Sequence, residues 1–187
     1  MASLPMFGRL YLTFDDGPDP TWTPRCLDVL AAANARATFF MIGRQAQRHP
    51  ELARRIGREG HAIGNHTLTH AYPWTIDRQR AVAEVRDGAA ALADVLGAAP
   101  KFFRPPHGAR RSAMLRAAAE VGESLVMWDV TATDWGWLGT SKGIARRLAR
   151  ASDGAIVLMH DGANKYNHPD QLLAVLPKFL SRLQGIT

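Results

Sequence analysis

The chain has very little cysteine and no long uninterrupted hydrophobic stretch. Its 187 residues include one cysteine, Cys26, which excludes an internal disulfide framework and a zinc site built from cysteine thiolates. No hydrophobic run approaches the roughly 20 residues that a membrane-spanning helix requires. We therefore expect no membrane span, and any bound metal must be held by histidine and carboxylate side chains.

Internal repeats, low-complexity segments and linkers are also lacking. A length of 187 residues corresponds to one domain with a substantial core, so residues 1–187 are expected to form a single domain. Met1–Pro5 shows no basic region followed by a hydrophobic core, and no signal peptide is visible. The expected location is extracellular or in the cell envelope if an export signal lies outside this chain, and cytoplasmic otherwise.

Positive charge is in excess, with 23 Lys and Arg against 17 Asp and Glu and a formal net charge of +6. Such an excess favours contact with anionic surfaces such as cell-wall polymers or nucleic acid. The arginines are spread through the predicted helices and do not cluster beside aromatic side chains, so we expect no nucleic-acid partner. The sequence leaves the oligomeric state open, with a monomer as the default.

Strand-like segments alternate with helical segments along the chain. The strand patterns cover residues 9–14, 37–42, 61–64, 101–103, 125–130 and 155–160, and the helical patterns cover residues 23–34, 50–59, 75–96, 112–121, 140–151 and 170–184. This alternation predicts a mainly parallel sheet or barrel of the α/β class. Because the loops after the strands meet at the C-terminal face of a β/α barrel, the polar residues that follow these strands are expected to share one cleft.

Two adjacent carboxylates end the first predicted strand. Asp15 and Asp16 are followed at once by Gly17 and Pro18, which stop the strand. Neighbouring residues of a continuing strand point to opposite faces, but at a turn both side chains can reach one cleft. Beside histidines, such a pair can divide its roles, because one carboxylate holds a metal ion while the other takes a proton from water.

His66 and His70 supply those histidines. Their spacing of four residues predicts that one helical turn places both imidazoles on the same side. With a carboxylate, they form a two-histidine, one-aspartate site with open positions, which is typical of catalytic zinc. Non-haem iron uses the same donors. We expect one divalent metal ion, zinc in the first place, with cobalt, nickel or iron as alternatives.

Five short motifs follow one another along the chain. They are residues 13–18 (Thr-Phe-Asp-Asp-Gly-Pro), 66–70 (His-Thr-Leu-Thr-His), 104–108 (Arg-Pro-Pro-His-Gly), 134–135 (Asp-Trp) and 158–160 (Leu-Met-His). In this order they resemble the motifs of polysaccharide deacetylases of the NodB-homology type, carbohydrate esterase family 4. The resemblance covers nearly the whole chain. It implies a distorted (β/α) barrel, incompletely closed at its C-terminal edge because the chain ends about where the family adds a last strand.

The resemblance also implies a role for each matched residue. Asp16, His66 and His70 resemble the metal ligands of the family. Asp15 resembles the catalytic base that takes a proton from the attacking water. His160 resembles the acid that protonates the departing amine.

The remaining matched residues are expected to support these groups. Arg104 resembles the residue that holds the base ionised and oriented, and Asp134 resembles the partner of the acid. Trp135 and Leu158 resemble the apolar wall around the acetyl methyl group. The backbone N–H at His107 resembles the donor to the oxyanion.

The resemblance implies a metal-dependent hydrolase that removes N-acetyl groups from the N-acetylglucosamine units of a chitin-like polymer or oligomer or of peptidoglycan. An O-acetyl esterase acting on xylan and a deformylase acting on a sugar substrate remain alternatives. A catalytically silent carbohydrate-binding module is the alternative of another class, although binding alone does not require the full acid, base and metal set. His107 stands where the family often has tyrosine, and Thr131 where it commonly has a second acid. Both departures leave the choice of substrate open.

Overall fold

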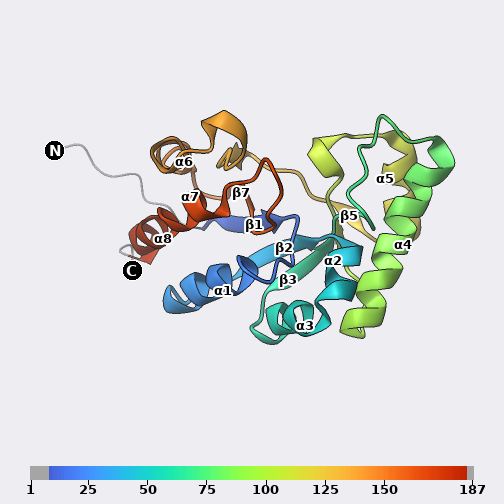
Figure 1. Cartoon of the computed structure of the whole chain (residues 1–187), viewed down its shortest axis with the longest axis horizontal. Coiled ribbons are helices and arrows are strands. Elements are labelled where there is room, and N and C mark those ends of the chain that lie inside the picture. The colour runs from blue at the N-terminus through green and yellow to red at the C-terminus, as the bar shows by residue number, and fades with distance from the viewer. Residues whose placement is uncertain (1–8, 185–187) are drawn as a thin grey trace.

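A seven-stranded sheet in which all neighbouring strands run parallel forms the centre of the protein (Figure 1). The computed structural model describes residues 9–184. The strands are β1 (Tyr11–Asp15), β2 (Ala37–Met41), β3 (Ala62–Asn65), β4 (Phe102–Phe103), β5 (Ser124–Leu125), β6 (Val130–Thr131) and β7 (Ile156–His160). Their spatial order is β5-β4-β3-β2-β1-β7-β6. The sheet curls into a half-barrel that is open between β5 and β6, which confirms the predicted, incompletely closed (β/α) barrel.

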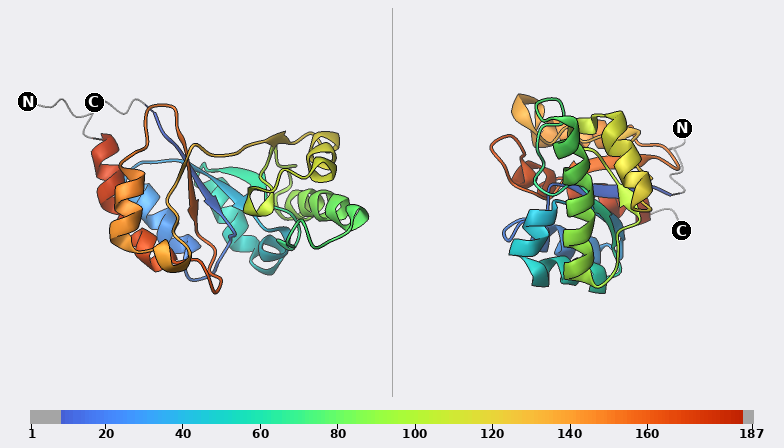
Figure 2. Two further views of the ribbon diagram at one scale, coloured as in Figure 1. Left: turned by 90° about the horizontal axis from the view of Figure 1, so that it is seen from above. Right: turned by 90° about the vertical axis from the view of Figure 1, so that its right-hand side faces the viewer.

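Helices surround the outer face of the curled sheet. They are α1 (Thr23–Ala32), α2 (Gly43–Arg48), α3 (Pro50–Arg58), α4 (Arg78–Leu96), α5 (Ser112–Glu120), α6 (Ser141–Leu148), α7 (Pro169–Leu173) and α8 (Leu176–Gln184), with short 3₁₀ turns η1 (Pro106–Gly108) and η2 (Gly136–Leu138). Helices α6, α7 and α8 lie at one end of the molecule and α4 and α5 at the other (Figures 1 and 2). Helix α1 contacts α3, α7 and α8, and α4 contacts α2, α3 and α5.

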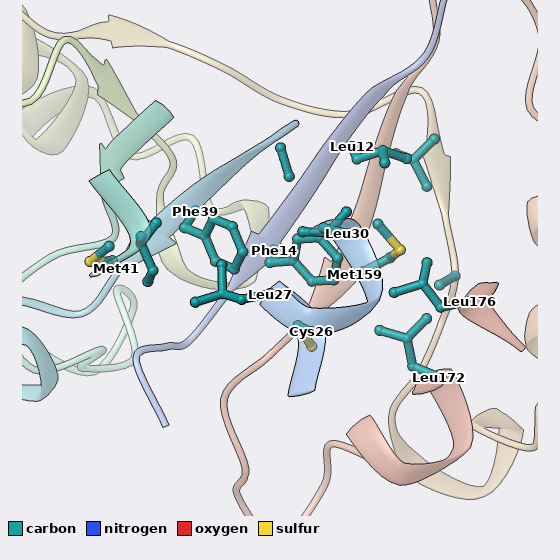
Figure 3. Packing of buried hydrophobic residues seen from close by; sticks show 14 of the residues in the cluster. Leu12, Phe14, Cys26, Leu27, Leu30, Phe39, Met41, Met159, Leu172 and Leu176 are labelled. Carbon is teal, nitrogen blue, oxygen red and sulfur yellow. The ribbon is translucent and has the colours of Figure 1, made fainter. Parts of the chain in front are cut away.

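Alternate residues of each strand face opposite sides of the sheet, as the two-residue period of a strand requires. One set packs against the helices in the hydrophobic core, in part shown in Figure 3, and includes Leu12, Phe14, Phe39, Met41, Val157 and Met159. The other set faces the hollow of the half-barrel, where Thr13 and Asp15 both accept hydrogen bonds from Arg104. Cys26 is buried in the core, and burial raises the pKa of its thiol.

The segment predicted as one strand over residues 125–130 forms two strands at opposite edges of the sheet. The N–H of Val126 donates to the carbonyl of Phe103 in β4, and the N–H of Asp129 donates to the carbonyl of Ile156 in β7. Only the two ends of this apolar run therefore find strand partners. Residues 126–129 cross the open side of the half-barrel between them.

Three helical predictions also differ from the structure. Helix α2 forms where no element was predicted. The helix could not be recognised from the sequence because its residues are mostly polar and only Gly43 and Ala46 are buried, so there is no hydrophobic period. The helix predicted over residues 170–184 is divided into α7 and α8. Helix α4 begins later than predicted, because the Asp77 carboxylate accepts the N–H of Arg80 and caps its first turn.

Among residues 9–184, no helix combines the length and the hydrophobicity needed to cross a membrane. The expectations about an export signal and about the last strand rested on Met1–Pro5 and on residues 185–187, which lie outside the described residues.

Candidate active site

The predicted site residues converge at the C-terminal ends of the strands. Eight of them line one cleft of about 430 Å³, namely Asp15, Asp16, His66, His70, His107, Trp135, Leu158 and His160. The other two lie directly behind it, because Arg104 is hydrogen-bonded to Asp15 and Asp134 to His160. Segments that are far apart in the sequence thus meet in one place because they all follow parallel strands.

Asp16, His66 and His70 form a cluster with the geometry of a metal site. One ligand atom from each residue lies within 4.8 Å of the others. The Oδ1 atom of Asp16 lies 3.5 Å from Nε2 of His66 and 3.2 Å from Nε2 of His70. Among the described residues, this buried oxygen has no hydrogen-bond partner. A buried carboxylate oxygen without a donor needs a cation to offset its desolvation, so the three residues fit a divalent metal ion.

The protonation states of the cluster suit a metal ligand set. The pKa of Asp16 lies well below its usual value: burial acts to raise it, but the interactions of the carboxylate with the nearby imidazoles of His66 and His70 outweigh burial. Burial and the charge of His66 lower the pKa of His70 to about 4. Near neutral pH, Asp16 is therefore ionised and His70 is neutral, and each can offer a lone pair.

His66 is oriented by a backbone group of a neighbouring strand end. Its Nδ1 atom lies 2.7 Å from the carbonyl oxygen of Arg104, so Nδ1 carries the proton and Nε2 is left to face Asp16. Burial acts to lower the pKa of His66, but the nearby carboxylates of Asp15 and Asp16 and the hydrogen bond with the carbonyl of Arg104 raise it above its usual value. A proton and a metal ion therefore compete for Nε2.

The predicted helical turn between the two histidines is not present. Residues 66–70 form a loop after β3 in which Thr67 (φ 70°) and His70 (φ 59°) adopt left-handed conformations. The two imidazole rings still lie close together, with their centroids 4.9 Å apart. The loop is not helical because Thr67 is left-handed, and the N–H of His70, which in a helix would donate to the His66 carbonyl, donates instead to the Thr67 hydroxyl at 3.1 Å.

Glu84 of α4 anchors this loop, and sequence analysis did not identify it. The buried carboxylate of Glu84 accepts two hydrogen bonds from Thr69, one from its backbone N–H at 2.8 Å and one from its side-chain hydroxyl at 2.7 Å. The backbone carbonyl of Glu84 also accepts the N–H of Leu68 at 2.8 Å. An acidic residue on the buried face of an amphipathic helix was the available signal.

Arg104 occupies the hollow of the half-barrel and is fully buried. Its Nη1 atom donates to the hydroxyl of Thr13 at 2.8 Å and to Oδ1 of Asp15 at 2.7 Å. Its Nε and Nη2 atoms donate to the carbonyls of Val126 and Met127 at 3.1 and 3.0 Å. The segment that crosses the open side of the half-barrel therefore fixes the guanidinium, and the guanidinium in turn fixes one oxygen of Asp15.

His160 and Asp134 form a closely bonded pair. Nδ1 of His160 lies 2.9 Å from Oδ1 of Asp134, and the His160 N–H donates to Oδ2 of the same carboxylate at 2.8 Å. Burial acts to lower the pKa of His160, but the charge of Asp134 and this hydrogen bond raise it to about 9. At neutral pH His160 is a cation whose free Nε2–H is available for donation.

The residues expected around the substrate line the rest of the cleft. Trp135 contacts His160 edge-on with 5.1 Å between ring centroids, and Leu158 lies on the same strand as His160. His107 is exposed and adopts a left-handed conformation (φ 57°), and its ring lies 4.8 Å from that of His70. Asp16 is left-handed as well (φ 76°). Strained backbone is thus concentrated in the loops of the cleft, as is common at functional sites.

The loop after β7 adds residues to the cleft that sequence analysis missed. Asn164, Tyr166 and Asn167 line it, as does Trp128 from the crossing segment. No motif marks these positions. Their place just after the last strand was the available signal, because polar residues at strand ends had already identified the other site residues.

A curled parallel sheet with a carboxylate and histidine cluster at its C-terminal end defines a metal-dependent hydrolase of the (β/α)-barrel class. A sequence model described as polysaccharide deacetylase matches residues 6–126. The chain belongs to this family, as predicted from its motifs.

Characterised relatives and solved structures agree with this assignment. The chain is 39% identical over 175 residues to a peptidoglycan-N-acetylglucosamine deacetylase of Bacillus cereus. The aligned region covers 92% of this chain and 80% of the relative. It is 40% identical over 154 residues to a chitooligosaccharide deacetylase of Bradyrhizobium, covering 82% and 70% of the two chains. Its fold matches that of a family 4 carbohydrate esterase from Streptomyces lividans in complex with acetate, with a TM-score of 0.84 and 32% sequence identity. The match covers 95% of this chain and 88% of the esterase chain.

Proposed function

We propose that this chain, as a single domain over residues 1–187, is a metal-dependent deacetylase of N-acetylglucosamine units in peptidoglycan or chitin-like oligomers. The observation that carries the proposal is the arrangement of three groups in one cleft: the Asp16, His66 and His70 cluster, the Arg104-bound Asp15, and the cationic His160. Relatives named for N-acetylglucosamine and chitooligosaccharide deacetylation support the substrate class.

Asp16, His66 and His70 would hold the metal ion through one carboxylate oxygen and two imidazole nitrogens. This donor set suits zinc, and cobalt, nickel or iron can occupy the same ligands. When bound, such an ion supplies Lewis acidity toward the amide carbonyl and lowers the pKa of water toward about 7.

Asp15 is proposed as the base. Arg104 engages its Oδ1 atom, which leaves Oδ2 directed toward the metal cluster, 3.7 Å from Nε2 of His66. A carboxylate fixed in this way can take a proton from a water molecule that attacks the amide carbon. The buried guanidinium of Arg104 keeps the carboxylate oriented throughout.

His160 is proposed as the acid. Because Nδ1 is engaged by Asp134, the proton that reaches the departing amine comes from Nε2. The carboxylate of Asp134 stabilises the imidazolium before the transfer and holds the ring in place. Protonation of the nitrogen makes it a free amine, which leaves as the C–N bond breaks and acetate is formed.

The acetyl group is proposed to lie against Leu158 and Trp135, whose apolar surfaces suit a methyl group. The backbone N–H of His107 is proposed to donate to the developing oxyanion. A larger tyrosine ring is absent from this position, so the cleft has room for an acetamido sugar within a chain. Action on peptidoglycan would take place at the cell envelope.

Mass spectrometry of defined substrates tests the proposal. The zinc-loaded protein, incubated with N-acetylglucosamine oligomers and with peptidoglycan, should produce the loss of one acetyl mass per event. Asp16→Ala should lose both this activity and its metal, as measured by elemental analysis. Efficient cleavage of acetylated xylan or of a formamido sugar, with every N-acetylglucosamine polymer left intact, would show that the proposed substrate class is wrong. Binding of the oligomers without any turnover would favour a carbohydrate-binding module.

A further inference from the structure

The loop between β7 and α7, residues 161–168, reaches back to the metal cluster. The side-chain amide of Asn167 donates to Oδ2 of Asp16 at 2.7 Å, and that of Asn164 donates to the same oxygen at 3.2 Å. Asn167 also donates to the carbonyl of Gly162 at 3.0 Å, which fixes the direction of its amide. These contacts involve neutral donors, so they leave the charge of the carboxylate unchanged.

The two oxygens of Asp16 therefore have different surroundings. Oδ2 accepts two amide N–H groups, whereas Oδ1 has no hydrogen-bond partner among residues 9–184 and lies between the His66 and His70 nitrogens. Amide donors that occupy Oδ2 prevent the carboxylate from turning. Only Oδ1 is then presented to a cation.

Internal hydrogen bonds hold the two asparagines in position. The side-chain oxygen of Asn164 accepts the N–H groups of Tyr166 and Asn167 at 2.7 and 3.0 Å. Asn167 forms a backbone bridge with Trp135, and the carbonyl of Tyr166 accepts the N–H of Gly136 at 2.8 Å. The loop is thereby attached to the segment that carries the partner of the acid.

We propose that Asn167, assisted by Asn164, is a positioning residue that fixes Asp16 as a single-oxygen metal ligand and so sets metal affinity. This inference rests on the proposed metal site. Outer groups that orient a ligand typically account for about 10- to 100-fold in metal affinity. Asn167 should carry the larger share, because its hydrogen bond to Asp16 is shorter.

Metal titrations of the variants test the inference without measuring turnover. The metal-free wild type, Asn167→Ala, Asn164→Ala and the double variant are titrated with zinc in competition with a chromophoric chelator. We expect the dissociation constant to rise about 10- to 100-fold in Asn167→Ala and less in Asn164→Ala. Lys165→Ala is the matched control, because this exposed residue lies on the same loop and its ammonium group lies over the ring of Tyr166. Its affinity should equal that of the wild type.

Cobalt spectra give a second measurement. In the double variant the freed Oδ2 can join the coordination, so the visible absorption of the cobalt form should weaken relative to the wild type as the coordination number rises. Matching circular dichroism and thermal unfolding of the metal-free proteins separate positioning from misfolding. If Asn167→Ala fails to fold, Asn167→Ser, which retains a donor, replaces it and should show an intermediate affinity.

Two outcomes distinguish this inference from the function on which it rests. A wild type that binds neither zinc nor cobalt overturns both. A wild type that binds metal, together with a double variant of unchanged affinity and unchanged cobalt spectrum, overturns the positioning role and leaves the proposed deacetylase intact.

Discussion

The groups proposed for proton transfer are fixed side by side by strand pairing. Asp15 and His160 are paired residues of the neighbouring strands β1 and β7, so their side chains emerge on the same face of the sheet. Each is held from behind by an oppositely charged partner, Arg104 or Asp134. The separation of the base from the acid is therefore set by the backbone, and the partners set only the direction of each side chain.

Substitution of either group should remove turnover without removing the metal. Asp15→Asn keeps the shape of the side chain but cannot accept a proton, and His160→Ala removes the donor. Each should lower kcat by about 10²- to 10⁴-fold, the usual contribution of general acid or base catalysis. Elemental analysis should find the same metal content as in the wild type, and steady-state kinetics with the site saturated gives kcat. A near-normal kcat in either variant would contradict the role of that residue.

The high pKa of His160 should depend on Asp134. In the metal-free protein that pKa is about 9, above the ordinary value of 6.5. The pair therefore contributes stability that is fully present below pH 6.5 and is lost as the pH rises through about 9. Asp134→Asn removes the charge, so the pKa should fall and this loss of stability should disappear.

Titration of the imidazole signals by NMR measures this pKa directly. An unchanged His160 titration in Asp134→Asn would show that another group sustains the high pKa.

At the scale of elements, α4 supports the loop that carries the histidines. Glu84→Ala would leave the N–H and hydroxyl of Thr69 without their partner. An unsatisfied buried donor costs about 1–3 kcal/mol; the donors of Thr69 are partly buried, so the free energy of unfolding should fall by about 1 kcal/mol, the low end of this range, and metal affinity should fall with it. Urea unfolding and zinc titration measure the two effects.

Arg86→Ala on the same helix is the matched control for this prediction. Its ion pair with Glu120 is exposed, and such pairs contribute at most about 1 kcal/mol. Equal effects of Glu84→Ala and Arg86→Ala on metal affinity would show that α4 does not position the histidine loop.

The order of strands and helices could be predicted because it depends on local patterns. Hydrophobic runs that end in polar residues identified β1, β3 and β7, and with them most of the cleft. The division of residues 125–130 into β5 and β6 could not be predicted, because it depends on hydrogen-bond partners in β4 and β7 that are distant in the sequence. Periodicity within the run carries no information about those partners.

The cleft was also predictable only in part: the residues in motifs were identified, and the residues that support them were not. Residues that act directly on chemistry, such as His66 and Asp16, belong to recognisable motifs. Residues that act through another side chain do not, because Glu84 resembles any helical acid and Asn167 resembles any polar loop residue until the fold brings them to their partners. The same limit explains the false helical turn, because the spacing of the histidines does not show that Thr67 is left-handed or that its hydroxyl accepts the N–H of His70.

For the whole molecule, the excess of positive charge should affect which substrates are reached quickly. With a net charge of +6, the protein should be attracted to anionic wall polymers, and salt should weaken this attraction because screening shortens its range to roughly 8 Å at physiological ionic strength. Added salt should therefore lower kcat/KM for peptidoglycan and leave kcat/KM for neutral N-acetylglucosamine oligomers unchanged. The same salt dependence for both substrates would exclude long-range attraction as the cause.

Removal of the metal should reduce the stability of the whole fold. A ligand that binds only the folded state stabilises it, by about 2.7 kcal/mol when its free concentration is 100 times the dissociation constant. A chelator should therefore lower the melting temperature, and added zinc should restore it. Asp16→Ala should melt at the same temperature with and without the chelator, and a chelator effect of wild-type size in this variant would place the metal elsewhere.

The alternation along β1 separates two kinds of residue that are neighbours in the sequence. Leu12 and Phe14 belong to the core, whereas Thr13 and Asp15 face the hollow with Arg104. For directed evolution, this arrangement makes the stability of the core and the chemistry of the cleft nearly separable. A library restricted to the core-facing positions Leu12 and Phe14 adjusts thermal tolerance and leaves the base and its arginine in place, whereas one that includes Asp15 removes the base itself.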